Sequence, residues 1–283
     1  MNPNAIMASV AAGALALGLA ACGSPRQESF PAGSTMDRLQ KAGKITVGVK
    51  YDQLGVGFKN LATGKLEGFD ISMAEIVAAD LGLSPDQIDY LEVPSQDRQL
   101  FLQSGRVDII IASYTINPER RRQVGQAGPY FVTGQQLLVR KEDQDTITGP
   151  DRLSGVAVCS ARGSTSYKRM QDEYKVSPVA ETYYTQCVQK LLNGSVDAVT
   201  TDGAILSFYA AQQPDRLAVV GRPFSEERWG IGYKKGDHPL CQFLTDTIRK
   251  AEDNGAWAKA FKDTLGKAGM NTPDRPTPDR CQD

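Results

Sequence analysis

Residues 102–111 read LQSGRVDIII, and residues 191–200 read LLNGSVDAVT. In each stretch a Leu is followed three residues later by Gly, and then by Val-Asp and an apolar run. Gly commonly ends helices, and a short apolar run is typical of a buried parallel strand. A helix–strand joint that occurs twice predicts two α/β units of similar plan, the alternative being a coincidence between two unrelated joints.

The segments around these joints also alternate between strand and helix. Residues 44–50, KITVGVK, predict a strand, and the helix after Gly68-Phe69 is expected to be capped by Asp70 and ended by Gly82. The length of 283 residues suggests about two domains. The other expected helices lie at 36–42, 96–104, after Asn117-Pro118, and at 164–174, 187–192, 240–254 and 257–265; the other expected strands lie at 107–112, 135–140, 155–158, 196–200 and 229–233.

The composition excludes several classes of protein. Lys and Arg number 32 and Asp and Glu 33, so the formal net charge is −1 and nothing indicates a nucleic-acid partner. His238 is the single histidine, which argues against a His-built zinc site and a Ser-His-Asp triad. The sequence also lacks a Walker A loop, a G-x-S-x-G elbow and a calcium-binding loop. We therefore expect no metal, no cofactor and no enzymatic activity.

The N-terminal region has the pattern of an export signal. Residues 8–21, ASVAAGALALGLAA, form an apolar segment that is too short to span a bilayer. It ends in Leu19-Ala20-Ala21-Cys22-Gly23, which resembles the bacterial lipobox. We expect a lipoprotein signal peptide at 1–21, a lipidated Cys22 that anchors the chain to the membrane outside the cytoplasm, and a flexible tether at 22–35. The alternative is a soluble signal peptide with an incidental Cys.

The other four cysteines form an even set, which favours disulfides in an exported chain. Four cysteines allow three pairings, and the sequence alone does not choose among them. The Pro-rich tail at 273–283 is expected to be loose unless Cys281 is linked, most simply to Cys241. Cys159 would then pair with Cys187 inside the second α/β unit.

Small polar side chains follow several of the expected strands. Ligands of open α/β sheets bind beyond the carboxyl ends of the strands, so we expect these residues to form a site. An α-carboxylate is bound by Arg and by helix N-terminal amides, whereas an α-ammonium is bound by a carboxylate and by hydroxyl or carbonyl oxygens. The residues present suit both groups and indicate a small zwitterionic ligand. They are Lys50, Ser113, Thr115, Arg120, Ser164, Thr165 and Asp202.

Over about residues 37–270 the chain resembles the polar-amino-acid solute-binding proteins, family 3, of ABC importers. The resemblance rests on five motifs, and within the family the chain is most similar to actinobacterial glutamate-binding lipoproteins. The features shared with those lipoproteins are VGVKYDQLGVG at 47–57, Cys159 with Cys187, and TTDGAIL at 200–206. One departure is Ser72, where the family usually has an acid. The five motifs are GFDISMAEIVAADLG at 68–82, LQSGRVDIIIASYTINPERR at 102–121, GPYF at 128–131, LSGVAVCSARGST at 153–165 and GSVDAVTTD at 194–202.

The resemblance implies an α/β fold of two similar lobes joined by hinge strands, the type II periplasmic-binding-protein fold. Lobe 1 would comprise residues 36–138 and 228–283, and lobe 2 residues 139–227. The ligand would lie in the cleft, and the closed form, expected to be a monomer, would dock on an ABC permease. The same fold would also suit a ligand-sensing subunit of a membrane signalling system or, as a third class, an exported dehydratase.

The resemblance also assigns roles to the site residues. Arg120 would bind the α-carboxylate with the amides and hydroxyls of Thr115 and Thr165. Asp202 and the carbonyl of Ser113 would bind the α-ammonium. Taken alone, Arg120 would be read as part of a solvated helix face, because it lies in the run Glu119-Arg120-Arg121-Arg122.

The ligand's side chain would be read by Lys50, Ser95, Arg98 and Tyr184. Relatives that bind acidic amino acids have basic residues at the positions matching Lys50 and Arg98, so we expect glutamate or aspartate, with asparagine or glutamine as alternatives. The plain alternatives are a surface lysine at position 50 and a surface salt bridge at position 98.

Overall fold

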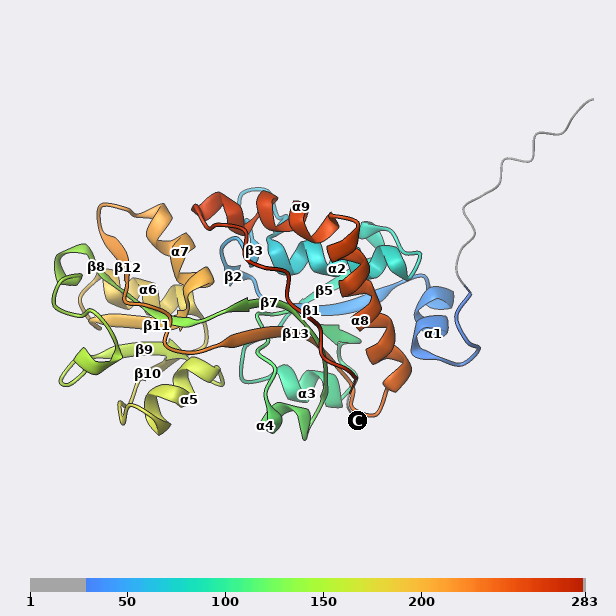
Figure 1. The fold of residues 1–283 in the computed structure, drawn as a ribbon, viewed down its shortest axis with the longest axis horizontal. Coiled ribbons are helices and arrows are strands. Elements are labelled where there is room, and N and C mark those ends of the chain that lie inside the picture. Colours follow the sequence, from blue (N-terminus) through green and yellow to red (C-terminus); the bar gives the residue numbers. More distant parts are fainter. Residues whose placement is uncertain (1–28, 282–283) are drawn as a thin grey trace, which may run out of the picture.

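The structure, a computed structural model, describes residues 29–281. Two five-stranded sheets lie side by side along the long axis of the molecule, each flanked by helices (Figure 1). We refer to the parts built on these sheets as lobe 1 and lobe 2. The expected signal peptide and Cys22 lie outside the described residues.

Lobe 1 is built on a sheet of five strands and carries six helices. The strands are β1 (Ile45–Val49), β5 (Ile88–Glu92), β6 (Ile109–Ile110), β7 (Gly125–Thr133) and β13 (Glu227–Tyr233). The helices are α1 (Thr35–Ala42), α2 (Phe69–Asp80), α3 (Arg98–Gln103), α4 (Pro118–Arg121), α8 (His238–Asp253) and α9 (Ala256–Asp263). The strand order is β5-β1-β6-β13-β7, with β1 parallel to β5 and β6, and β13 antiparallel to its neighbours.

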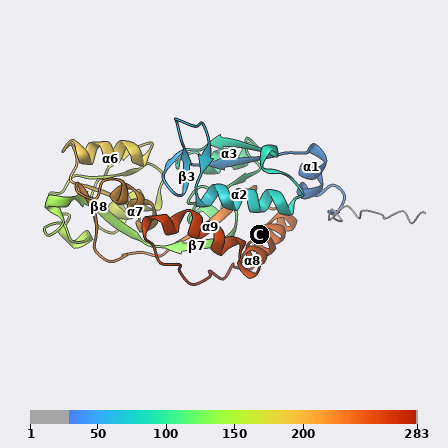
Figure 2. The ribbon, with the colours of Figure 1, turned by 90° about the horizontal axis from the view of Figure 1, so that it is seen from above.

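Helices α2, α8 and α9 cover one face of this sheet, and α3 and α4 lie on the other (Figure 1). Seen from above, α2 lies beside α8 and α9 (Figure 2). Phe69 of α2 packs edge-on against Trp257 and Phe261 of α9, and all three side chains are buried. Such aromatic pairs add to the free energy of burial and hold this layer on the sheet.

Lobe 2 has a sheet of similar plan. Its strands are β8 (Gln135–Arg140), β9 (Val158–Ala161), β10 (Val179–Glu181), β11 (Ala198–Asp202) and β12 (Leu217–Val220), in the order β10-β9-β11-β8-β12. β9 is parallel to β10 and β11, whereas β8 is antiparallel to β11 and β12. Its helices are α5 (Thr165–Asp172), α6 (Tyr184–Leu192) and α7 (Gly203–Gln212).

Smaller elements complete the chain. A three-stranded sheet in lobe 1 consists of β2 (Asp52–Gln53), β3 (Gly57–Lys59) and β4 (Leu66–Glu67). Short 3₁₀ helices lie at Pro85–Gln87, Lys141–Asp143, Pro150–Arg152 and Leu265–Ala268. Within residues 29–281, no helix combines the length and the apolar character that crossing a membrane requires.

The repeated Val-Asp motif has the same structural role in both lobes. The Asp108 carboxylate accepts the amide of Thr46 in β1 at 2.9 Å, and its own amide donates to the Thr46 carbonyl. Asp197 makes the matching pair of bonds with Ala157, which directly precedes β9. In each lobe the Asp therefore connects the beginnings of two neighbouring parallel strands by hydrogen bonds. The repeated motif thus occupies equivalent positions in the two lobes.

Two segments connect the lobes. β7 passes through Gly134 into β8, and residues 221–226 lead from β12 back to β13. A Cβ atom at Gly134 would lie 2.4 Å from the Ser225 carbonyl oxygen, so glycine permits the close approach of the two segments. The first crossing precedes the expected boundary after residue 138, because β8 is paired from Gln135 onward with lobe 2.

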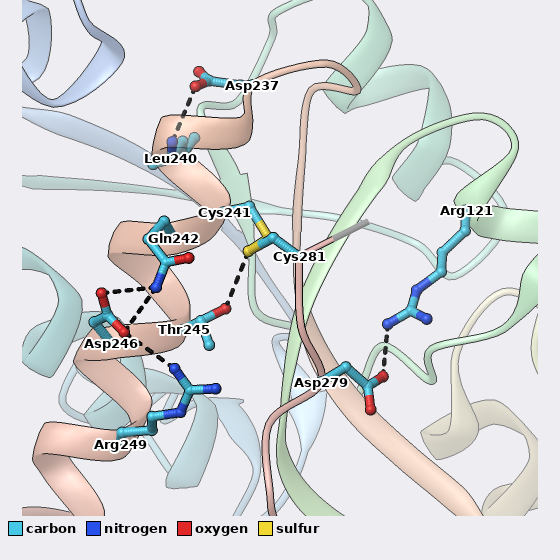
Figure 3. Close-up of a disulfide and its surroundings, with 10 residues drawn as sticks. All are labelled: Arg121, Asp237, Leu240, Cys241, Gln242, Thr245, Asp246, Arg249, Asp279 and Cys281. Atoms are coloured by element: carbon cyan, nitrogen blue, oxygen red, sulfur yellow. Dashed lines mark hydrogen bonds and ion pairs between the residues drawn. A yellow bond between two sulfur atoms is a disulfide. The ribbon is translucent and has the colours of Figure 1, made fainter. Parts of the chain in front are cut away.

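Residues 29–281 contain two disulfides, Cys159–Cys187 in lobe 2 and Cys241–Cys281 in lobe 1, which is the pairing that we favoured. The Pro-rich tail is not loose. Asp279 forms an ion pair with Arg121 at 2.8 Å, and Cys281 links the tail to α8 (Figure 3). Asp279 also forms an ion pair with Arg228 at 2.8 Å. The polar contacts of Asp279 hold the tail where its composition predicted no structure.

Two local expectations were wrong. Asp70 does not cap α2: Gly68 holds that position with φ +130°, and a Cβ there would lie 2.3 Å from the Val56 carbonyl oxygen. Asp70 is instead fully buried and accepts hydrogen bonds from the Ser113 amide and the Tyr130 hydroxyl. The strand expected at 155–158 is β9 at Val158–Ala161, because pairing with β10 sets its position.

Candidate functional site

A small, narrow cavity lies between the lobes. Its lobe 1 wall is formed at the carboxyl end of β6 and by the segment before α3, and its lobe 2 wall by the ends of β9 and β11. Eight of the expected site residues line it: Ser95, Arg98, Ser113, Thr115, Ser164, Thr165, Tyr184 and Asp202. Ser166, Thr201 and Ile205 complete the lining. Lys50 and Arg120 reach this set through bonds to its members.

Two buried guanidinium groups lie on the lobe 1 side. Arg98 is 2% exposed and Arg120 is 5% exposed, and both lie over the ring of Tyr114. Arg98 donates to the Ala112 carbonyl at 3.0 Å, and Arg120 to the Thr115 carbonyl at 2.7 Å. Both also reach the Gly163 carbonyl of lobe 2, at 3.5 and 3.2 Å. These two side chains therefore extend from lobe 1 to the backbone of lobe 2.

Arg120 is positioned by the start of α4. Asn117 caps this helix by accepting the Arg120 amide at 2.8 Å, and Pro118 occupies its first turn, as the sequence predicted. This short turn directs Arg120 inward, while Arg122 is exposed. The run of charges is therefore not a uniformly solvated face.

Lys50 is also buried, with 3% of its surface exposed. Its Nζ donates to the Val93 carbonyl at 2.8 Å and to the Ser95 hydroxyl at 2.9 Å. An ammonium has three protons, so one remains for a further acceptor. Position 50 is therefore not a snorkelling surface lysine.

These three cations make no ion pair with any of residues 29–281; their protein partners are neutral oxygens and the Tyr114 ring. Burial, with Arg98 nearby, lowers the pKa of Lys50 to about 7. Burial, with Arg120 nearby, lowers the pKa of Arg98 to about 9, and burial lowers that of Arg120. Desolvated cations without a direct ion pair are costly, and such perturbed groups concentrate at functional sites.

The lobe 2 side supplies one carboxylate. Asp202, at the end of β11, is 4% exposed and accepts the indole N–H of Trp229 at 2.5 Å. Burial, together with the negative charge of Glu227, raises the pKa of Asp202 to about 7. An ammonium group placed beside Asp202 would stabilise its ionised form.

The start of α5 presents unpartnered donors to the cavity. Ser164 caps the helix by accepting the Tyr167 amide at 2.9 Å. The hydroxyl of Ser166 is buried and has no hydrogen-bond partner, and the Thr165 amide donates to no group within residues 29–281. A helix N-terminus with free donors favours an anionic group.

From the family resemblance we expected the hydroxyls of Thr115 and Thr165 to bind the ligand's α-carboxylate. In the structure they bind a protein carboxylate instead. Both donate to Oε2 of Glu227, each at 2.8 Å. A hydroxyl has one proton, so neither donates elsewhere at the same time. In this arrangement the residues offer a ligand their backbone amides rather than their hydroxyls.

The remaining expected residues also have protein partners. The Ser113 carbonyl accepts from Arg98 at 3.3 Å, and its hydroxyl donates to Gln53. The Tyr184 amide donates to the carboxylate of Asp52 at 2.8 Å, which joins α6 of lobe 2 to lobe 1. Tyr184 is therefore held at the lobe boundary by its backbone while its ring lines the cavity.

Sequence reasoning missed Ser166, Ile205 and Glu227, whereas Thr201 was expected among the polar residues at the end of the strand at 196–200. Ser166 directly adjoins the expected residue Thr165, so its position was a usable signal. Glu227 follows a polar segment, and nothing in its neighbourhood marks it as buried. No cluster of metal-binding side chains occurs in the described part of the chain.

Two α/β lobes that close on a small cavity lined by buried charges define a two-lobed receptor for a small charged molecule. The chain belongs to the bacterial extracellular solute-binding proteins, family 3, whose family model matches residues 45–267. This result and the two-lobe type II fold confirm the family and fold expected from the sequence.

Similar proteins have named ligands of several kinds. The glutamate-binding protein GluB of Corynebacterium efficiens is 35% identical over 235 residues, covering 80% of each chain. A glutamine-binding protein of Geobacillus stearothermophilus is 37% identical over 229 residues, covering 80% of this chain and 86% of that protein. The solved receptor for L-cysteine of Neisseria gonorrhoeae has a TM-score of 0.80 at 26% identity, covering 85% and 98% of the two chains.

Proposed function

We propose that this protein binds an acidic amino acid, glutamate or aspartate, between its lobes and delivers it to an ABC permease. The observation that supports the proposal is a set of three buried cations, Lys50, Arg98 and Arg120, that lie at or beside the cavity and form no ion pair within residues 29–281. We further propose that a lipid on Cys22 anchors the protein outside the cytoplasm. The protein would act without chemical conversion of its ligand.

The charges favour a ligand with two carboxylates. The α-ammonium would pair with Asp202, and the α-carboxylate with Arg120 and the amides of Thr115 and Thr165. This leaves Lys50 and Arg98 for the side chain. A neutral amide would accept hydrogen bonds from them but would not balance their charge, whereas a carboxylate would do both.

Isothermal titration calorimetry with glutamate, aspartate, glutamine and asparagine tests the ligand. We expect an acidic amino acid to bind more tightly than its amide by about tenfold or more, since charge-assisted bonds are about twice as strong as neutral ones. Tighter binding of the amide would refute acidic specificity. No binding of any amino acid would refute the proposal as a whole.

A second measurement separates delivery from signalling and catalysis. The ligand-loaded protein should stimulate ATP hydrolysis by its ABC permease reconstituted in liposomes, and the ligand should be recovered unchanged. Stimulation of a membrane sensor kinase instead would support the signalling alternative. Dehydration of a prephenate-like acid by the purified protein would support the enzymatic one.

A further inference from the structure

The segments that connect the lobes meet at one buried carboxylate. Glu227 is the first residue of β13, directly follows the second crossing and is 1% exposed. Its Oε2 accepts a hydrogen bond from Thr115 of lobe 1 and another from Thr165 of lobe 2, each at 2.8 Å. A single oxygen therefore joins one cavity residue of each lobe.

The other oxygen of Glu227 extends this network to the first crossing. Oε1 accepts hydrogen bonds from Arg169 of α5 and from the Ser225 hydroxyl. The same Arg169 nitrogen donates at 3.1 Å to the side chain of Gln135, which is the first residue of β8. Arg169 therefore connects lobe 2 to both crossings through charge-assisted bonds, which are stronger than neutral ones.

This network fixes the relative placement of the donors that face the cavity. Thr115 follows the end of β6, and Thr165 begins α5, so their amides come from opposite walls. Because the hydroxyls of Thr115 and Thr165 bind the same oxygen, the distance between the backbones of these two residues is restricted. The ionised form of Glu227 is favoured, since bonds from Arg169 and three hydroxyls outweigh burial and lower its pKa.

We propose that Glu227 is an interlobe positioning residue that sets how lobe 2 closes on lobe 1 and thereby places the amides of Thr115 and Thr165 for the ligand's α-carboxylate. The proposal rests on the proposed function for the identity of that ligand. Glu227 itself does not contact the ligand. Its contribution is therefore common to all α-amino acids and independent of the ligand's side chain.

The test compares Glu227→Gln with Glu226→Gln by calorimetry with glutamate and glutamine. Glu226 is the matched control because it is adjacent in sequence and its side chain is 72% exposed. Its ion pair with Arg228 is long, at 3.9 Å. Glu227→Gln should raise the Kd of both ligands by about tenfold or more, as expected for weakening hydrogen bonds to a charged group. The ratio of the two Kd values should stay unchanged, and Glu226→Gln should match the wild type.

Small-angle X-ray scattering of the same variants supplies a readout that does not depend on the ligand. Because Glu227 joins the lobes directly, the ligand-free Glu227→Gln protein should have a larger radius of gyration than the wild type and Glu226→Gln. If no amino acid binds the wild type, the proposed function fails, but this comparison still decides the role of Glu227. An unchanged radius together with unchanged affinities would overturn the inference.

Thr165→Val keeps the test decisive if Glu227→Gln does not fold. Valine has a similar shape, keeps the backbone amide and removes only the lobe 2 hydroxyl that bonds to Glu227. It should weaken both ligands in parallel and expand the ligand-free protein. An unchanged Kd for both ligands, or a selective loss of one of them, would contradict an interlobe role for Glu227.

Discussion

Replacing Lys50 by Met tests whether the buried ammonium group binds the side-chain carboxylate of the ligand. Methionine keeps an unbranched apolar side chain of similar length but has no charge. Lys50 is 3% exposed and uses two of its three protons on the Val93 carbonyl and the Ser95 hydroxyl. The change therefore removes a desolvated charge that has no ion-pair partner within residues 29–281.

The structure sets the expected magnitude. Burial, with the nearby charge of Arg98, lowers the pKa of Lys50 from 10.5 to about 7, so charging this group in the free protein costs about 5 kcal/mol more than charging a lysine in water. A ligand carboxylate would offset much of this cost, and truncating one partner of a buried charge pair costs about 2–5 kcal/mol. We expect the Kd for glutamate to rise by about 30-fold or more. The Kd for glutamine should rise by about tenfold or less, because a neutral amide only accepts a hydrogen bond.

Lys50→Met should lower the affinity for glutamate, measured by calorimetry, without lowering the unfolding free energy measured in urea. The variant should bind glutamate weakly, yet the free protein should be at least as stable as the wild type below about pH 7, where charged Lys50 is most costly. This stability difference should shrink as pH rises toward 10.5, because the wild-type lysine is then neutral in both states. Lys44→Met is the matched control, since Lys44 is 62% exposed and pairs with Asp89 on the surface. Equal weakening of glutamate and glutamine would refute the role given to Lys50.

Arg120→Lys should weaken the binding of every α-amino acid tested by calorimetry by about 2–5 kcal/mol. Arg122 is exposed, so the control variant Arg122→Lys should bind like the wild type. A loss confined to acidic ligands would contradict the α-carboxylate role of Arg120. In the wild type, the ratio of the Kd for glutamate to the Kd for glutamine should rise by up to about tenfold per pH unit above about pH 7. The reason is that Lys50 loses its proton in the free protein above this pH and must regain it when a carboxylate binds. A ratio that does not change with pH would contradict this assignment. Replacing Cys159 and Cys187 by Ser should lower the unfolding free energy by about 3–4 kcal/mol in urea titrations, and unchanged stability would show that the loop is not constrained by this disulfide.

Much of the fold was predictable from local patterns. The repeated Gly and Val-Asp joints, the β-branched strand at 44–50 and the Asn117-Pro118 helix start all depend on interactions between neighbours in sequence. These elements are present because hydrogen-bond geometry and side-chain alternation act over a few residues. The link of the Pro-rich tail through Cys281 was expected, but the contacts of Asp279 with Arg121 and Arg228 were not, because these arginines are distant in sequence.

The candidate site was predictable as a set of residue types but not as an arrangement. Strand ends and motifs indicated Arg120 and Asp202, and the family resemblance implied Arg98; all three are buried at or beside one cavity. The sequence had no means of showing that the hydroxyls of Thr115 and Thr165 would be taken by Glu227. Such a contact depends on how two lobes meet, and no local pattern encodes that distance.

The sequence by itself determined the class of this protein: two α/β units, polar residues at their strand ends, and a family resemblance that the comparison confirmed. The tertiary structure alone decided which charges are buried without a direct ion pair, which cysteines pair, and that Asp70 supports Ser113 rather than a helix end. The physical reason is that secondary structure follows from near neighbours, whereas desolvation and interlobe bonding depend on groups far apart in the chain.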